Sequence, residues 1–256
     1  MPDTEAAAAK IERLPHVPNG TLVYAVGDIH GRVDLLEKMH TAILKDSLDV
    51  ACERKVVVYL GDYIDRGPHS KKVVDVLLEK PLKGFEPVHL IGNHEAFLIE
   101  FLKDIEAGPG WFFNGGLATL ASYGIKFGRA DELDVATLER IRDDFMKKVP
   151  QAHLDFFHKL AFTRTEGDYF FVHAGVRPGV ALDNQTDEDM LWIREDFLGS
   201  EQDFGKIVVH GHTITWEPDI RPNRIGIDTG AFASGILTAL VLEGREQDFL
   251  TVTGPV

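Results

Sequence analysis

The sequence predicts a mixed α/β fold in which two β-sheets pack face to face and helices cover the outside. Three observations support this prediction. Strand-like and helix-like segments alternate in the first hundred residues, strand-like segments follow one another after residue 162, and a helix-rich segment separates the two parts. Alternation is typical of a mainly parallel sheet, and consecutive short strands are typical of antiparallel pairing. The chain of 256 residues is long enough for one large domain, which we place at residues 20–256.

The first part alternates strand and helix three times. Short apolar runs predict strands at Thr21–Val26, Val56–Leu60 and Val88–Ile91. Apolar residues at helical spacing predict helices at Asp34–Lys45 and Ser70–Glu79, and a third helix that begins near His94. Ser70 is a candidate N-cap, because its hydroxyl can accept a bond from a free backbone N–H.

Residues 103–150 interrupt this alternation. We interpret them as a helical insertion that lies over one side of the functional site described below. The segment opens with glycine and proline, continues with the aromatic residues 111–113, and contains one amphipathic helix at Val135–Val149. Apolar clusters within a domain usually belong to its core, so we expect the aromatic residues to pack internally and not to form a ligand platform.

The last part is rich in strands. Phe162–Thr165 and Asp168–Val172 predict a hairpin that turns at Glu166-Gly167. Further apolar segments predict strands at Lys206–Val209, Ile225–Asp228, Ile236–Leu242 and Glu246–Val252, which we expect to pair antiparallel. At the opposite end, residues 1–19 contain four alanines and then several helix breakers, which favours a flexible tail.

Composition excludes several classes of protein. Asp and Glu number 41 against 27 Lys and Arg, a net charge of −14, whereas a general nucleic-acid binder needs a cationic surface. No apolar run reaches the roughly 20 residues of a membrane span, and the N-terminus lacks the features of a secretory signal, so we expect a cytoplasmic protein. Cys52 is the single cysteine, which leaves only oxygen and nitrogen donors for a metal site.

Five short glycine-containing segments carry the functional information, and most of them follow a predicted strand. They are Gly27-Asp28-Ile29-His30-Gly31, Gly61-Asp62-Tyr63-Ile64-Asp65-Arg66-Gly67, Gly92-Asn93-His94-Glu95, His173-Ala174-Gly175 and Gly211-His212-Thr213. Each one alone is compatible with an ordinary turn or helix start. Together they place side chains of matched chemistry at the carboxyl ends of several strands, where ligands bind in open α/β sheets.

The residue types indicate metal-assisted chemistry on a phosphate group. Asp28 and Asp62 would repel each other unless a cation lay between them, and a carboxylate such as Asp62 can bridge two metals. Asn93 offers a neutral amide oxygen, and His94 is suited to donate a proton near neutral pH. Arg66 is suited to bidentate phosphate contact, although an ion pair with its neighbour Asp65 is an alternative interpretation.

These segments resemble the signatures of the metallophosphoesterase superfamily, and within it those of the phosphoprotein phosphatase family of serine/threonine phosphatases. The family signatures Gly-Asp-x-His-Gly, Gly-Asp-x-x-Asp-Arg-Gly and Gly-Asn-His-Glu occur intact and in order, followed by His-Ala-Gly and Gly-His-Thr. The resemblance covers roughly Leu22 to Leu242 and implies the calcineurin-like two-sheet fold. It is closest to compact bacterial and phage-like members.

The resemblance also implies a role for each site residue. Asp28 and His30 would hold one metal, Asp62 would bridge, and Asn93, His173 and His212 would hold the second. His94 would protonate the leaving alkoxide and Asp65 would orient it, while Arg66, Arg194 and Asn93 would contact the phosphate. His210 lies two residues before His212 and competes with it, but the Gly-His-Thr match favours His212. The implied cofactors are two divalent ions, with manganese first and iron or zinc as alternatives.

The implied reaction is hydrolysis of phosphate monoesters by a metal-bridging hydroxide, with phosphoserine and phosphothreonine in proteins as the leading substrates. The main alternative is hydrolysis of dinucleoside polyphosphates. The related bacterial branch with that activity typically lacks the acid at Asp65 and has Asp at the position of Glu95, which favours the phosphatase. Small phosphorylated metabolites and phosphotyrosine are further substrates to consider, and a silent phosphopeptide-binding module is a third reading. No eukaryotic-type regulatory subunit is expected, because the segment from Arg221 to Phe232 lacks the corresponding loop sequence.

Overall fold

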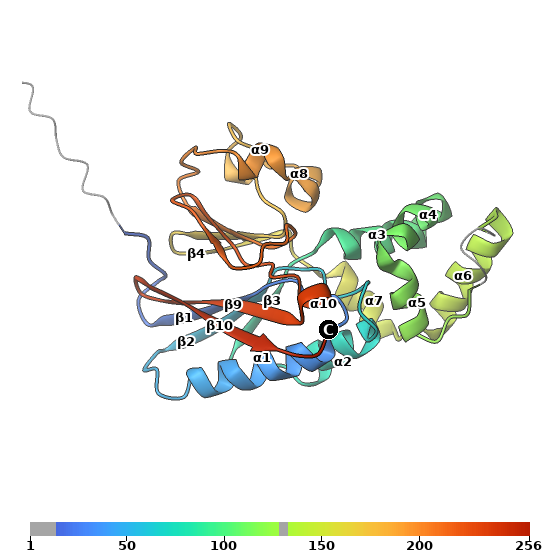
Figure 1. The fold of residues 1–256 in the computed structure, drawn as a ribbon, viewed down its shortest axis with the longest axis horizontal. Coiled ribbons are helices and arrows are strands. Elements are labelled where there is room, and N and C mark those ends of the chain that lie inside the picture. The colour runs from blue at the N-terminus through green and yellow to red at the C-terminus, as the bar shows by residue number, and fades with distance from the viewer. Residues whose placement is uncertain (1–13, 128–132) are drawn as a thin grey trace, which may run out of the picture.

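The computed structural model describes residues 14–127 and 133–256, and its strands form two five-stranded sheets packed against each other (Figure 1). The first sheet has the order β10-β9-β1-β2-β3. Its strands are β1 (Thr21–Val26), β2 (Arg54–Tyr59), β3 (Glu86–His89), β9 (Ile236–Glu243) and β10 (Glu246–Thr253). Strands β1, β2 and β3 are parallel, whereas β9 pairs antiparallel with both β1 and β10.

The second sheet has the order β4-β5-β6-β8-β7. Its strands are β4 (Thr163–Glu166), β5 (Tyr169–Val172), β6 (Ile207–His210), β7 (Asp219–Ile220) and β8 (Arg224–Gly226). The predicted hairpin is present, because β4 pairs antiparallel with β5 across a turn at Gly167. The two-sheet fold predicted from the sequence is therefore confirmed.

Helices cover both outer faces of the sandwich. Helices α1 and α2 lie below the first sheet in Figure 1, and α8 and α9 lie above the second. The helices outside the insertion are α1 (Val33–Asp46), α2 (Ser70–Glu79), α3 (Asn93–Lys103), α7 (Gln151–His158), η3 (Leu182–Asn184), α8 (Asp187–Trp192), α9 (Glu195–Leu198) and α10 (Ala231–Ser234). Those of the insertion are η1 (Ile105–Ala107), α4 (Gly108–Trp111), η2 (Phe112–Gly116), α5 (Leu117–Ser122) and α6 (Val135–Lys148).

The core forms three apolar layers, as expected for two sheets with helices on both outer faces. Strand β1 shows the reason, since successive side chains of a strand point to opposite faces. Its Val23 and Ala25 pack between the two sheets, while Leu22 and Tyr24 pack toward α1 and α2. The third layer lies between the second sheet and helices α8 and α9, and includes Phe197.

One expectation about the last part of the chain needs correction. Strands β5, β6 and β8 are parallel, not antiparallel. Parallel neighbours require a long crossover, which helices α8 and α9 provide between β5 and β6. These helices were not predicted from the sequence, because each has at most six residues and shows too little periodicity to recognise.

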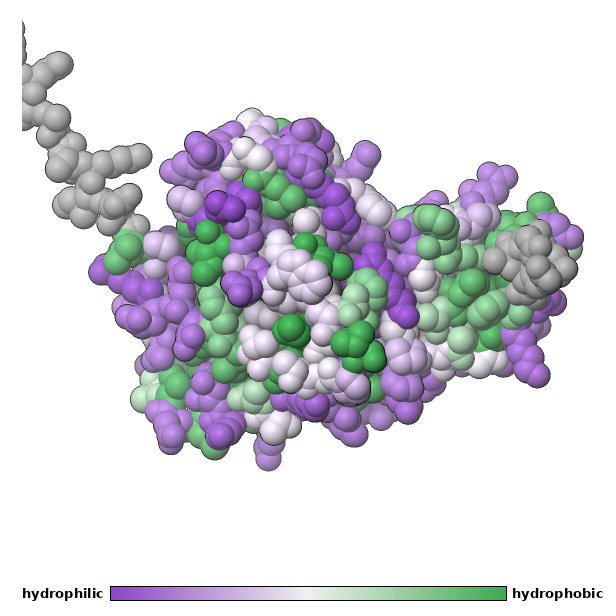
Figure 2. Space-filling model, in the orientation of Figure 1, coloured by the Kyte–Doolittle hydropathy of each residue, from purple (hydrophilic) through white to green (hydrophobic). Residues whose placement is uncertain are grey.

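The insertion is helical in its described part, and helices α4, α5 and α6 project to one side of the sandwich (Figure 1). Figure 2 shows more hydrophobic surface over this lobe than over the sandwich. Phe113 and Val135 are among its exposed apolar side chains. The aromatic cluster is only partly internal, because Trp111 and Phe112 are buried whereas Phe113 is 92% exposed.

The last residues of the predicted tail, within 14–19, are attached to the sandwich. Residues 1–13 lie outside the described residues. Val17 is already fully buried, and its N–H bonds to the carbonyl of Gly244 at the turn before β10. The chain is therefore tied to the sandwich before residue 19.

Candidate metal centre

The five motif segments, which we call the metal-facing loops (residues 27–31, 61–67, 92–95, 173–175 and 211–213), converge on one region. Within the described residues, five non-glycine residues have positive φ, and all five belong to the predicted site. They are His30 (45°), Asp62 (53°), Asp65 (70°), Arg66 (63°) and His212 (64°). This conformation is unfavourable for such residues and concentrates where function requires it.

Asp62 lies between two groups of histidines. Its Oδ2 is 3.4 Å from Nε2 of His30, and its Oδ1 is 3.5 Å from Nε2 of His173. The carboxylate is 2% exposed and thus faces protein on both sides. A carboxylate with each oxygen turned to a different group of donors has the geometry required to bridge two cations.

The second group is centred on the amide oxygen of Asn93. This oxygen is 2.9 Å from Nε2 of His173 and 2.9 Å from Nδ1 of His212. Asp62, His173 and His212 also bring ligand atoms within 4.8 Å of one another, as do His30, Asp62 and His94. The donor set therefore fits two metal ions that share Asp62.

His30, His173 and His212 have surroundings that favour neutral imidazole ligands. Nδ1 of His30 donates to the carbonyl of Ile64 at 2.8 Å, and Nδ1 of His173 donates to the carbonyl of Leu60 at 2.8 Å, which leaves each Nε2 free to bind a cation. Burial lowers the pKa of His30 to about 3 and that of His212 to about 2, and burial also lowers the pKa of His173. Neutral imidazole is the form that binds metals.

Asp28 lies beside a second acid that the sequence analysis did not assign to the site. Its carboxylate accepts the backbone N–H of His212 at 3.1 Å, and burial, then Asp228 and then Asp62, raise its pKa. Burial also raises the pKa of Asp228 to about 6. Several carboxylates buried together in this way are stabilised by a cation. The position of Asp228 at the end of a predicted strand could have indicated this role in the sequence.

His94 differs from the other histidines of the centre. Its Nδ1 lies 2.7 Å from Oδ2 of Asp65, and both residues are fully buried. Burial opposes its charge, but the carboxylates of Asp62 and Asp65 outweigh burial and raise the pKa of His94. Its Nε2 has no hydrogen-bond partner among the described residues and lies 3.8 Å from Asp62. A buried imidazole held at Nδ1 by a carboxylate can donate a proton from Nε2 at the centre.

The two predicted phosphate-binding arginines both border the centre. The guanidinium of Arg66 lies 4.7 Å from the ring centroid of Phe232, which itself packs against His30. Arg194 is exposed, and its Nη1 donates to the hydroxyl of Thr213, next to His212. The side chains of Arg66 and Arg194 therefore both lie close to predicted metal ligands.

Two further residues of the motif region have places that the sequence left open. His210 is buried against Phe197 with its Nδ1 near the carbonyl of Gly211, and it lies in neither ligand group found among the described residues. Glu95 does more than cap a helix. Its carboxylate accepts the backbone N–H groups of Asp62 and Gly92, among others, and so fixes the loop that carries Asp62.

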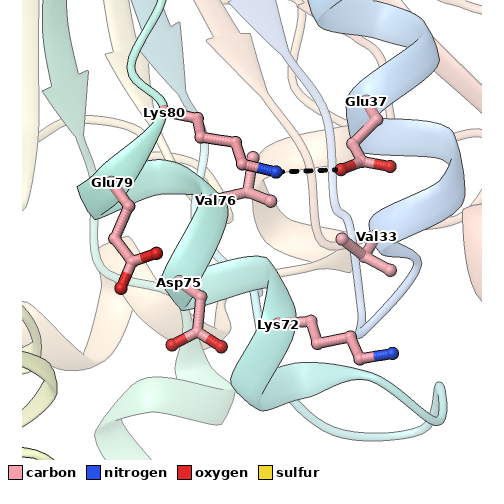
Figure 3. A pocket seen from close by; sticks show the side chains of 7 residues that line it. All are labelled: Val33, Glu37, Lys72, Asp75, Val76, Glu79 and Lys80. Atoms are coloured by element: carbon pink, nitrogen blue, oxygen red, sulfur yellow. Dashed lines mark ion pairs between the residues drawn. The ribbon is translucent and has the colours of Figure 1, made fainter.

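A separate surface hollow of about 320 Å³ lies between α1 and α2 (Figure 3). It is lined by charges of both signs, including the pair Lys80 and Glu37. None of its lining residues belongs to the metal-facing loops, so we assign it no part in the chemistry.

In the described residues, no helix has both the length and the apolar character needed to cross a membrane.

Comparisons with known proteins agree with this geometry. The model of a family described as calcineurin-like phosphoesterase matches residues 21–232. A bis(5'-nucleosyl)-tetraphosphatase PrpE [asymmetrical] from Bacillus subtilis is 30% identical over 251 residues, covering 90% of this chain and 93% of the relative. The protein of the same name from Anoxybacillus flavithermus is 28% identical over 248 residues, covering 90% and 92%.

Solved structures show the same fold. A crystal structure described as a candidate diadenosine tetraphosphatase has a TM-score of 0.60 and 21% identity, covering 93% of this chain and 99% of that chain. A variant of a cold-active protein tyrosine phosphatase has a TM-score of 0.53 and 13% identity, covering 94% and 84%. At these identities the likeness concerns the fold alone.

Proposed function

Since the chain belongs to the calcineurin-like phosphoesterase family, we propose that it is a metal-dependent hydrolase whose first substrate class is a dinucleoside tetraphosphate. The observation that carries the hydrolase assignment is Asp62, whose two oxygens face two separate groups of metal donors. The substrate class is supported by the relatives named as tetraphosphatases, which match along nine tenths of this chain. The order of substrates expected from the sequence is thereby reversed, because protein phosphomonoesters move to second place.

The ligand set leads us to propose manganese first, with iron and zinc as alternatives. Carboxylate and amide oxygens together with neutral imidazoles suit all three ions. When bound, such ions would supply positive charge and an activated water for attack on phosphorus.

The side chains of the chain itself would do the remaining work. We propose that Arg66 and Arg194 bind phosphate oxygens, with Asn93 beside them, and that these contacts hold the phosphorus in line for attack. His94 would donate a proton from Nε2 to the leaving oxygen, while Asp65 holds the opposite edge of the ring.

Exposed aromatic surface next to the centre supports a nucleotide substrate. Trp192 is 38% exposed, and its ring packs edge-to-face against His212 and against Phe97. Bases stack on exposed aromatic rings with about 1–3 kcal/mol per base. An indole at this place can therefore receive one base of a dinucleotide whose phosphates lie at the metals.

A specific observation favours the second candidate, phosphomonoester hydrolysis. The pair Asp65 and His94 is fully buried, and its contact at Nδ1 leaves Nε2 of His94 to face Asp62 at 3.8 Å, where it can supply a proton. A serine or threonine alkoxide needs that proton in order to leave, whereas a nucleotide leaves as a stable phosphate anion.

A rate comparison tests both candidates. The protein loaded with manganese is assayed on diadenosine tetraphosphate and on a phosphoserine peptide, and the products are separated by chromatography. We expect faster cleavage of the tetraphosphate, with release of a nucleoside triphosphate and a monophosphate in agreement with the asymmetrical relatives. A higher kcat/KM on the peptide would reverse our order of substrates. No metal-dependent hydrolysis of either would refute the enzyme assignment.

A further inference from the structure

We propose that Trp111 and Thr119 of the insertion are positioning residues, which hold the Asp65 carboxylate so that His94 can act as proton donor. They belong to residues 108–122, which comprise α4, η2 and α5 and which we call the insertion bracket. The proposal rests on the proposed function, and within it on the phosphomonoester candidate, whose leaving alkoxide needs the proton that His94 would donate.

Both oxygens of Asp65 are occupied by donors from the insertion bracket. Oδ2 accepts the indole N–H of Trp111 at 2.8 Å, besides its 2.7 Å contact with His94. Oδ1 accepts the hydroxyl of Thr119 at 2.5 Å. With a donor on each side, the carboxylate cannot rotate without breaking a hydrogen bond.

The bracket also holds the main chain of the turn that carries Asp65. The hydroxyl of Thr119 accepts the backbone N–H of Asp65 at 2.9 Å, and the N–H of Arg66 bonds to the carbonyl of Gly115 at 3.3 Å. Asp65 and Arg66 both have positive φ, at 70° and 63°. Such conformations persist only where the surroundings enforce them, and these bonds supply that enforcement. Ser70 was predicted as a candidate N-cap, but His69 is the N-cap of α2, and the hydroxyl of Ser70 instead accepts the same N–H of Asp65 at 3.1 Å.

The bracket is shaped around Trp111. A Cβ atom on Gly116 would lie 2.6 Å from ring carbons of Trp111, so the indole occupies space that only glycine leaves free. Between Phe112 and Gly116 the chain is kinked at Gly115, whose φ of 106° is not helical. Asp65, Trp111 and Thr119 are all fully buried, and a buried carboxylate is costly unless its oxygens are hydrogen-bonded. These features explain why an indole, and not a phenyl ring, stands at this place.

The expected role is indirect. The proton moves from Nε2 of His94 to the leaving oxygen, and Asp65 orients the ring from Nδ1 without touching the substrate. Trp111 and Thr119 act one step further out, by orienting Asp65. Loss of their hydrogen bonds should therefore matter most when the leaving group needs a proton.

Two phosphate esters with different leaving groups test this role. The manganese-loaded protein and the variants Trp111→Phe and Thr119→Val are assayed on phenyl phosphate, whose leaving oxygen needs a proton, and on p-nitrophenyl phosphate, which releases a stable anion. We expect kcat on phenyl phosphate to fall about tenfold in each variant, since a positioned acid contributes about 10²–10⁴-fold in total, and kcat on p-nitrophenyl phosphate to stay within about twofold.

Matched variants provide the controls. Phe112→Leu changes a buried aromatic neighbour that does not contact Asp65, and it should lower both rates equally or not at all. Thr119→Ser keeps the hydroxyl and should restore the rate on phenyl phosphate. An equal loss on both esters in Trp111→Phe, or no loss, would show that Trp111 only packs and would overturn the proposal.

A second measurement does not depend on activity. The chain has three tryptophans, so its indole N–H signals can be assigned by NMR in ¹⁵N-labelled, metal-free protein from the signal lost in Trp111→Phe. We expect that signal to be protected from solvent exchange and to shift in Asp65→Asn. A rapidly exchanging signal that ignores Asp65→Asn would overturn the proposal. Wild-type protein that hydrolyses neither ester, but shows the protected signal, would instead contradict the phosphomonoesterase candidate within the proposed function.

Discussion

The metal-facing loops and the insertion bracket both hold buried polar groups, but they differ in how the chain brings those groups together. Each metal-facing loop lies directly after a strand or at a helix start, so neighbouring strands bring its side chains to one edge. The insertion bracket reaches Asp65 from positions 46 and 54 residues away, with no strand pairing to guide it. The loops thus carry ligand atoms for metal ions. The bracket instead carries hydrogen-bond donors for Asp65, a residue of the loops.

This difference predicts different consequences of substitution. Changes in the loops should remove metal binding or chemistry outright. Changes in the bracket should leave the metals in place and lower the rate or the stability by smaller amounts. The following predictions test that separation, beginning with the largest expected effect.

Asp62→Asn should produce the largest loss. The substitution removes the charge shared by both donor groups, so kcat/KM on p-nitrophenyl phosphate should fall about 1,000-fold or more, since metal assistance contributes several kcal/mol. Metal content measured by elemental analysis should fall as well. His210→Asn is the matched control, because this buried histidine lies outside both ligand groups. Full metal content and full activity in Asp62→Asn would contradict the assignment of the metal-facing loops as the metal site.

Asp65→Asn should have the next largest effect, at the point where the two regions meet. The amide cannot support the charged His94 ring, so kcat on phenyl phosphate should fall about 100-fold, whereas KM should change less than about threefold. Metal content should remain that of the wild type. An unchanged turnover number would remove Asp65 from the mechanism, and loss of metal would assign it to the metal-facing side.

Gly115→Ala tests the bracket by stability. Gly115 has φ of 106°, and a Cβ there would lie 2.9 Å from the backbone nitrogen of Arg66. We expect a loss of about 1–3 kcal/mol in the free energy of unfolding, measured by urea denaturation. Gly110→Ala is the control within the same segment, because its Cβ would meet its nearest atom only at 3.9 Å and should be neutral or slightly stabilising. Equal stability of the two variants would show that the contact with Arg66 is not tight.

Glu166→Gln should affect stability alone, because Glu166 lies in the β4–β5 hairpin and ties it to β2 through Arg54. Burial raises the pKa of Glu166, but hydrogen bonds from Arg54 and Arg164 outweigh burial and lower it below its ordinary 4.5. The lowered pKa stabilises the fold at pH values above about 4.5, and this contribution disappears as the pH falls through the folded-state pKa.

We therefore expect Glu166→Gln to lose about 1–3 kcal/mol at pH 7, because hydrogen bonds to charged groups are lost, although both arginines are partly exposed and their bonds are weakened by solvent. The variant should lose less further stability than the wild type between pH 5 and pH 3. Urea midpoints across this range provide the measurement. A parallel decline of both proteins with pH would contradict the assignment, and a lower kcat at pH 7 would show that the sandwich is not independent of the site.

Much of the fold could be predicted from the sequence because the information is local. The first three strands and two helices appear within two residues of their expected bounds. Long periodic segments and strands buried on both faces have a clear pattern. The parallel pairing of β5, β6 and β8 could not be predicted, because short strands have the same pattern in either direction and the crossover helices α8 and α9 are too short to recognise.

The sequence by itself determined which donors exist and where along the chain they lie: Asp28, His30, Asp62, Asn93, His173 and His212 all occur in glycine-flanked segments that could be recognised without coordinates. Only the tertiary structure decided that the oxygens of Asp62 face two groups, that Asp228 lies beside Asp28, and that Trp111 and Thr119 hold Asp65. The physical reason is the distance along the chain over which each feature is determined. Residue type and short spacing determine turns and ligand chemistry, whereas contacts between distant segments depend on how sheets and helices pack in three dimensions.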